Sequence, residues 1–303
     1  METAGSDNHG FSVQWSPQIA IEQMDSLGIS TAMLSVTMPG ARVFQGSNAR
    51  ALARQMNENI ASVCGENPDR FGFFVNLPDV LLDTAGALEE IRYGLDVLKA
   101  DGVILFTRYG DGNTYLGNPN IEAIWEELNK HNAVVLVHPS NATEKVVVNP
   151  RLPHLLIEGP HETTRAAMDM IVSGTVRKFP DCKIVLCHAG GTLPWVIGRV
   201  LDGLDLFGIL DPHQALQDFG RFYFELALST KPSVVAMLRS LVSDQQILYG
   251  VGSRPQACET INKTNHFISR ITPITRSNFA SNHQMSSKNR SFMTPSLERR
   301  FIV

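Results

Sequence analysis

Residues 102–138 read GVILFTRYGDGNTYLGNPNIEAIWEELNKHNAVVLVH, and this stretch decides the fold class. Gly102–Phe106 and Val134–Val137 are short apolar runs rich in β-branched residues, as is typical of strands buried on both faces. Between them, Ile121–His131 carries apolar residues at three- and four-residue spacing, which predicts a helix. A strand, a helix and a second buried strand in this order predict a parallel sheet with right-handed crossovers.

The same alternation extends in both directions along the chain. Five further apolar runs predict strands at 30–36, 71–77, 184–186, 222–226 and 247–249. Helical spacing recurs at 16–27, 51–62, 84–99, 163–179 and 233–242. The first of these helices, with Ser16 as its cap and Pro17 at its first position, precedes every strand, so a strand is expected upstream of it. Seven strands fit either an incomplete (β/α)₈ barrel or an open doubly wound sheet, and periodicity alone does not choose.

Composition narrows the class of protein. The 303 residues are 43% apolar and 18% charged, an ordinary balance for a globular protein. A formal net charge of −4 without a basic block argues against nucleic acid or an anionic membrane as partner. We expect a cytosolic protein, because there is no secretory signal pattern and the four scattered cysteines form no C-x-x-C pair. The sequence predicts one domain over 1–270 and a polar, disordered tail over 271–303.

Two histidines follow predicted strands, His138 in LVHPS and His188 in VLCHAGG. Side chains at the carboxyl ends of parallel strands reach the mouth of a barrel, where neutral imidazole can bind a divalent metal or move a proton. A hydrogen-bonded structural histidine is the competing interpretation, and the residues alone leave both open. The pair Gly190–Gly191 is expected to let the backbone approach whatever lies in the mouth. His154 and His161 are expected to flank a loop.

Known motifs for other chemistry are absent from the sequence. It contains no G-x-x-x-x-G-K-[ST] phosphate loop, no G-x-G-x-x-G after a strand and no G-x-S-x-G nucleophile elbow. A nucleotide-binding protein and a serine hydrolase are therefore both disfavoured.

Longer segments resemble the amidohydrolase-2 decarboxylases, which include the aminocarboxymuconate semialdehyde, γ-resorcylate and 6-methylsalicylate decarboxylases. The resemblance runs from about Trp15 to Gly250, and LVHPS followed by HAGG-T-LPW in this spacing is specific. The fungal 6-methylsalicylate type is the most similar. Other matching segments are MDSLGISTAMLSVTMPG (24–40), ALARQMNENIA (51–61), PDRFGFFVNLP (68–78) and FYFELALS (222–229).

The resemblance implies an α/β fold, a TIM-like (β/α)₈ barrel of the metal-dependent hydrolase type that lacks its first strand. It implies that His138 is a metal ligand from the fifth strand, and that His188 lies near the metal as a ligand and moves a proton in catalysis. The implied metal is a divalent cation, Zn²⁺ or Mn²⁺, and the implied assembly is a homodimer. The residues expected to line the substrate pocket are the segment Ser35–Gly40 and Phe106, Arg108 and Tyr109.

Two features depart from the family pattern. The family's first strand ends in H-x-H or E-x-H, but the alignment places Met1 in the loop after that strand. The family's eighth strand ends in G-[ST]-D-x-P, whereas this chain reads ILYGVGSRP and has residues 251–254 where the aspartate belongs. The chain is therefore expected to be truncated at its N-terminus, to diverge after Gly250, and to expose two unpaired strand edges.

The function implied by the resemblance is metal-dependent, non-oxidative decarboxylation of a hydroxylated aromatic acid such as 6-methylsalicylate, in polyketide secondary metabolism. Two alternatives remain. One is a metal-dependent amidohydrolase or lactonase, because the wider superfamily shares the barrel. The other is a catalytically inactive, truncated paralogue that packs against an intact copy.

Overall fold

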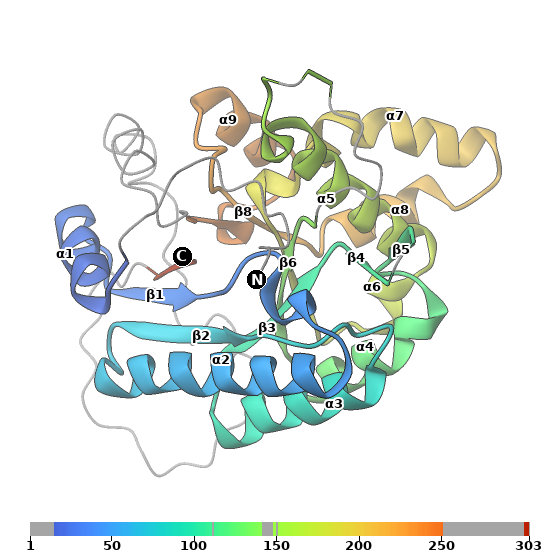
Figure 1. The fold of residues 1–303 in the computed structure, drawn as a ribbon. Helices are drawn as coiled ribbons and strands as arrows, with labels where there is room; N and C mark the ends of the chain where they lie inside the picture. Colours follow the sequence, from blue (N-terminus) through green and yellow to red (C-terminus); the bar gives the residue numbers. More distant parts are fainter. Residues whose placement is uncertain (1–14, 111, 141–147, 150, 251–299, 303) are drawn as a thin grey trace, which may run out of the picture.

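The computed structural model describes residues 15–110, 112–140, 148–149, 151–250 and 300–302. The seven strands expected from the sequence are confirmed, and all are parallel to their neighbours. They are β1 (Thr31–Leu34), β2 (Phe71–Val75), β3 (Gly102–Phe106), β6 (Val134–His138), β7 (Lys183–Leu186), β8 (Tyr223–Glu225) and β9 (Ile247–Leu248). Their order in the sheet is their order in the chain, and the sheet curls with its helices on the outside (Figure 1).

An eighth strand, β10 (Arg300–Ile302), pairs in parallel with the free side of β1, with Ala32 opposite Phe301 (Figure 1). The expectation of an unpaired edge at β1 is therefore wrong over these residues. A strand from the far end of the chain lies there. At the opposite end of the sheet, β9 has no second neighbour among the described residues. The rest of the expected tail lies outside the described residues, so the predicted division into a domain and a tail stays a prediction.

Helices cover the outer face of the sheet, α2, α3 and α4 on one side and α5, α7, α8 and α9 on the other (Figure 1). Their bounds are α1 (Pro17–Leu27), α2 (Gly46–Glu66), α3 (Thr84–Arg92), α4 (Glu122–Lys130), α5 (His154–Val172), α6 (Thr175–Lys178), α7 (Leu193–Leu206), α8 (Pro212–Phe219) and α9 (Pro232–Leu241). The expected cap is confirmed, because Ser16 Oγ accepts the Ile19 N–H at 3.2 Å. Among the described residues, no helix is long and apolar enough to cross a membrane.

Two parts of the helical layer differ from the expectation. Helices α7 and α8 were not predicted individually. The segment expected to be a loop between His154 and His161 forms the first turns of α5, although Pro160 lies inside that helix. A proline removes one backbone donor, and the helix nevertheless continues through it, with Gly159 and Glu162 buried beside it.

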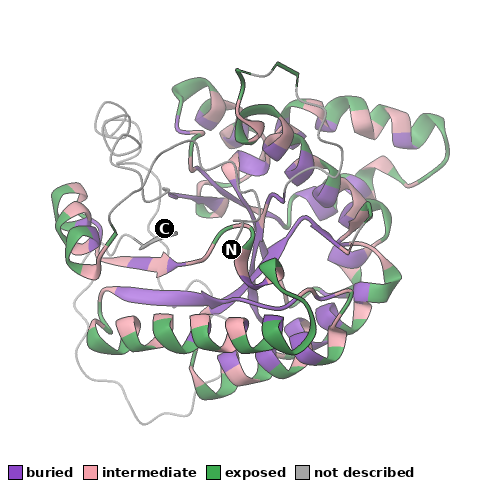
Figure 2. Ribbon diagram, in the orientation of Figure 1, coloured by how far each residue is buried: buried purple, intermediate pink, exposed green. Residues whose placement is uncertain are grey.

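The strands are buried almost throughout, and the core lies on both faces of the sheet (Figure 2). Its largest fully buried side chains include Trp125, Tyr109, Phe219, Phe222 and Phe224. Burial on both faces explains why these strands read as continuous apolar runs rather than as alternating ones.

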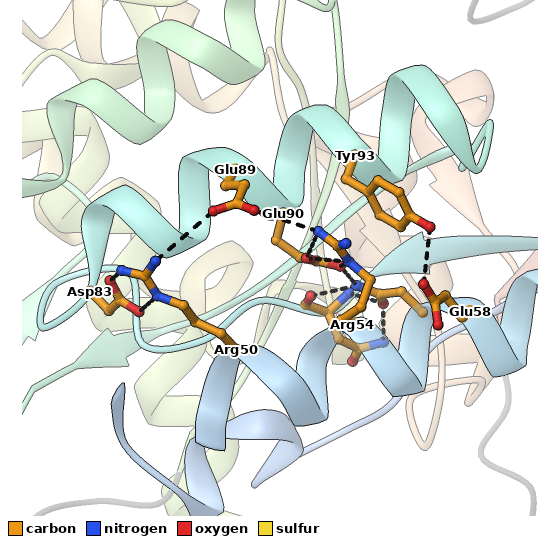
Figure 3. A network of polar contacts seen from close by, with 9 residues as sticks. Arg50, Arg54, Glu58, Asp83, Glu89, Glu90 and Tyr93 are labelled. Atoms are coloured by element: carbon orange, nitrogen blue, oxygen red, sulfur yellow. Dashed lines mark hydrogen bonds and ion pairs between the residues drawn. The ribbon is translucent and has the colours of Figure 1, made fainter. Parts of the chain in front are cut away.

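Ion pairs join helices α2 and α3 (Figure 3). Arg50 binds Asp83 with two nitrogens, at 2.6 Å and 2.5 Å. Arg54 lies 2.9 Å from the buried Glu90 and its guanidinium lies 3.6 Å from the Tyr93 ring centroid. The network joins α2 to α3, and its Arg50–Asp83 pair lies where the two helices begin.

Candidate active site

The structure brings His138 and His188 together at the carboxyl edge of the sheet. His138 is the last residue of β6, and His188 follows β7 by one intervening residue. Their ring centroids lie 5.6 Å apart, with the rings at 70° to one another. The pairing of adjacent strands β6 and β7 fixes this proximity, because Val137 lies opposite Leu186 in the register.

Both imidazoles are neutral at neutral pH. Burial and, to a smaller extent, the nearby His188 lower the pKa of His138 to about 4; burial lowers the pKa of His188 to about 4. His138 Nδ1 lies 3.0 Å from the Pro139 carbonyl oxygen, which assigns the tautomer with the proton on Nδ1. The lone pair of His138 is then on Nε2, the arrangement of a metal-binding or proton-accepting histidine.

His188 lies in an unusual turn. Its φ is 56° and that of Ala189 is 58°, so two consecutive residues with a Cβ adopt the left-handed conformation. The glycines that follow were expected to leave room for a ligand, but they approach the protein itself. A Cβ on Gly190 would lie 2.8 Å from the Phe224 ring, and one on Gly191 would lie 2.0 Å from the Pro160 carbonyl oxygen.

Glu225, at the end of β8, was missed by the sequence reasoning. Its side chain is buried, and Oε2 accepts the His188 N–H at 3.2 Å. The other oxygen accepts the Ala227 N–H, and the Cys187 thiol hydrogen-bonds to the same carboxylate. Burial raises the pKa of Glu225 to about 7. The available signal was a single acidic residue inside the apolar run FYFEL.

Of the predicted pocket residues Phe106, Arg108 and Tyr109, Phe106 lies beside His138. The Phe106 ring meets the His138 ring edge-on, with centroids 6.4 Å apart. Tyr109 is buried, and its hydroxyl oxygen accepts the Phe106 N–H at 2.8 Å. Arg108 turns inward, where its Nε lies 2.6 Å from a Glu162 oxygen and its Nη1 donates to Asn113 at 2.6 Å. Substrate binding by these three residues stays a prediction.

Arg42 was also missed, since the expected pocket segment ended at Gly40. Its guanidinium lies over the rings of Phe106 and Tyr109, at 5.8 Å and 4.8 Å from their centroids. Nη1 donates to the Arg108 carbonyl at 2.9 Å, and Nε lies 3.2 Å from an Asp79 oxygen. Arg42 therefore forms an ion pair with Asp79 beside the candidate site, and its charge is balanced there.

The described residues do not complete a metal site. His138 and His188 offer two neutral imidazoles, but within the described ranges no group of three histidine, cysteine or acidic side chains could hold an ion. Catalytic zinc uses three protein ligands. The two positions at which the sequence departs from the family pattern, before residue 15 and at residues 251–254, both lie outside the described residues.

Comparison with known proteins agrees with this geometry. A family model described as amidohydrolase matches residues 6–249. The 6-methylsalicylic acid decarboxylase of Penicillium expansum is 38% identical over 255 residues, which cover 82% of this chain and 78% of that protein.

Solved structures confirm the fold. The 2,6-dihydroxybenzoate decarboxylase from Rhizobium is 25% identical, with a TM-score of 0.68 over 81% of each chain. The dihydroxybenzoic acid decarboxylase from Polaromonas sp. JS666, solved with bound manganese and 2-nitroresorcinol, is 20% identical, with a TM-score of 0.70 over 86% of this chain and 81% of that one. The incomplete barrel is thus favoured over the open doubly wound sheet, and the chain belongs to the amidohydrolase family of the amidohydrolase-2 decarboxylase type.

Proposed function

We propose that this chain catalyses non-oxidative decarboxylation of a hydroxylated aromatic acid of the 6-methylsalicylate class. The observation that carries the proposal is the pair of buried, neutral imidazoles at the ends of β6 and β7, His138 and His188. The similarity to the Penicillium expansum decarboxylase supports the substrate class. For 6-methylsalicylate the product would be m-cresol.

The reaction needs a proton at the ring carbon that carries the carboxylate. As that carbon gains a proton, the bond to the carboxylate breaks, its electron pair returns to the ring and CO₂ leaves, so the overall step consumes one proton. His188 delivers this proton in the proposal. Because burial lowers the pKa of His188 to about 4, the ring is neutral at neutral pH, so in the proposal it first takes up a proton from solvent. The imidazolium so formed is a stronger acid than a solvated histidine and passes the proton on to the ring carbon readily.

Neighbouring residues would bind the ring and its charge. An aromatic acid in the mouth would pack against Phe106, whose ring already contacts His138. The Arg42 guanidinium lies beside that ring and would help to bind an anionic substrate, although its charge is balanced by Asp79. Arg108 remains a predicted substrate-binding residue, although its charge is balanced by Glu162.

The divalent cation, zinc or manganese, is part of the proposal, and the Polaromonas decarboxylase was solved with manganese. Such an ion would polarise the substrate's carboxylate or hydroxyl oxygen. The described residues supply only His138 and His188 toward it, so no step above depends on it. A role in polyketide secondary metabolism, a cytosolic location and a homodimer belong to the same proposal.

The test is an assay of the purified chain with 6-methylsalicylate, measuring released CO₂ and m-cresol, together with the metal content by mass spectrometry. His188→Asn should abolish turnover, whereas His213→Asn, which alters an exposed histidine on α8, should leave it unchanged. Full activity in His188→Asn contradicts the proposal.

Two other results would favour the alternatives. A ring-opened acid without CO₂, formed from a lactone or amide substrate, would support an amidohydrolase. Protein without metal that turns over no aromatic acid would support an inactive paralogue.

A further inference from the structure

We propose that Glu225 is the positioning residue that holds His188 in its left-handed turn and keeps the imidazole beside His138. The link to catalysis rests on the function proposed above; the structural claim does not. The structural claim rests on three observations: the backbone conformation of the turn, the hydrogen bonds of the carboxylate and the tight packing around the carboxylate.

The turn is unfavourable by itself. His188 and Ala189 both have φ near +57°, where their Cβ atoms crowd the backbone. Conformations of this kind persist only where the surrounding structure fixes them, and they concentrate at functional sites. Something must therefore hold this turn.

The Glu225 carboxylate makes the contact that does so. Oε2 accepts the N–H of His188 at the first strained residue. The Cys187 thiol, at the residue before it, hydrogen-bonds to the same carboxylate. The other oxygen accepts the Ala227 N–H, which anchors the carboxylate to the segment after its own strand. The end of β7 is thereby tied to the end of β8.

The backbone just after β9, at Gly250, also lies against the carboxylate. A Cβ on Gly250 would lie 1.5 Å from Glu225 Oε1, so only glycine fits at that position while the carboxylate is there. Glu225 is 2% exposed, between the fully buried Phe224 and Leu226. A carboxylate is costly to bury, and a purely apolar core would not need one. Its donors all come from the turn and the adjoining strand ends.

The test compares Glu225→Gln with Glu225→Asp. The amide keeps the volume but has one acceptor oxygen, so its NH₂ group faces either the His188 or the Ala227 N–H. The aspartate keeps the charge but is shorter by one methylene. Asp218→Asn is the control, because it also neutralises a buried carboxylate, on α8 before the start of β8 and paired with Arg177.

The first readout is independent of activity. In protein labelled with ¹⁵N-histidine, the ring signals of His188, assigned by their loss in His188→Asn, should shift or broaden in Glu225→Gln. In Glu225→Asp they should shift less, and in Asp218→Asn they should stay unchanged. The proposal is overturned if the His188 ring signals of Glu225→Gln match those of the wild type. It is also overturned if these signals change as much in Asp218→Asn as in Glu225→Gln.

The second readout measures kcat and KM separately, with 6-methylsalicylate as the substrate. Displacement of His188 by about 1 Å should lower kcat about 100-fold and leave KM within about twofold, with partial recovery in Glu225→Asp. A rise in KM at constant kcat would overturn a positioning role. If the wild type itself turns over no aromatic acid, the proposed function fails, and the ring signals still decide the role of Glu225.

Discussion

The pair Arg108–Glu162 provides the sharpest test of how the candidate site is built. Arg108→Met keeps most of the side-chain length but removes the charge. Arg108 and Glu162 side chains are 5% and 1% exposed, and Nε lies 2.6 Å from Oε2 as an ion pair without the angle of a hydrogen bond. The substitution therefore leaves a buried carboxylate without its main partner.

The magnitude follows from what remains around Glu162. Removing one member of a buried ion pair costs about 3–5 kcal/mol of unfolding free energy. Arg165 Nη1 at 3.0 Å and the Tyr115 hydroxyl at 3.2 Å still contact Glu162, but the Arg165 side chain is 62% exposed and its charge is screened. We therefore expect a loss at the lower end, about 3 kcal/mol.

The assay is urea unfolding followed by circular dichroism. The double variant Arg108→Met/Glu162→Gln should be more stable than Arg108→Met alone, because no charge is then left buried without a partner. Arg239→Met breaks a partly exposed pair with Asp244 and should cost less than about 1 kcal/mol. A loss below about 1 kcal/mol in Arg108→Met, or additive effects in the double variant, would refute the reasoning. A raised KM at unchanged stability would instead support Arg108 as a substrate-binding residue.

Three further predictions concern other parts of the fold. A hydrogen bond from Arg92 lowers the pKa of Glu127 to about 2. The ionised Glu127 therefore stabilises the fold fully above pH about 4.5, and this stabilisation is lost as the pH falls toward 2. Arg92→Met should flatten the dependence of the urea midpoint on pH over this range. Deletion of residues 300–303 leaves the β1 edge unpaired and should increase light scattering on warming, and unchanged scattering would contradict the role of β10. Gly191→Ala should lower the melting temperature, because its Cβ would meet a carbonyl oxygen of α5 at a positive φ, whereas Gly198→Ala in α7 meets nothing within 4 Å and should leave it unchanged or raised.

Most of the fold could be predicted because strands buried on both faces leave a plain signal. All seven apolar runs became strands, and Ser16–Pro17 marked the start of α1. The signal fails where tertiary contacts override local preference. The segment between His154 and His161 was expected to be a loop, yet it is helical in α5 although it contains Pro160. The pairing of β10 with β1 left no local signal, because three residues in a polar segment carry no period.

The candidate site could be predicted as far as the strand ends allow. His138 and His188 were found because their position after buried strands places them at one edge of the sheet. Arg42 and Glu225 were missed because their roles depend on contacts between distant segments. Arg108 was expected to face the substrate, and nothing in the local sequence indicated its partner Glu162, which lies on α5 far along the chain.

The parallel pairing of β10 with β1 bears on how the protein is made. The ribosome synthesises β1 long before the strand that pairs with it, so β1 waits without this neighbour while the intervening chain emerges. Contacts between such distant segments are intrinsically slow to form. The first strand of the sheet can therefore reach its final pairing only after β10 has been synthesised, and an unpaired strand edge is exposed to aggregation in the meantime.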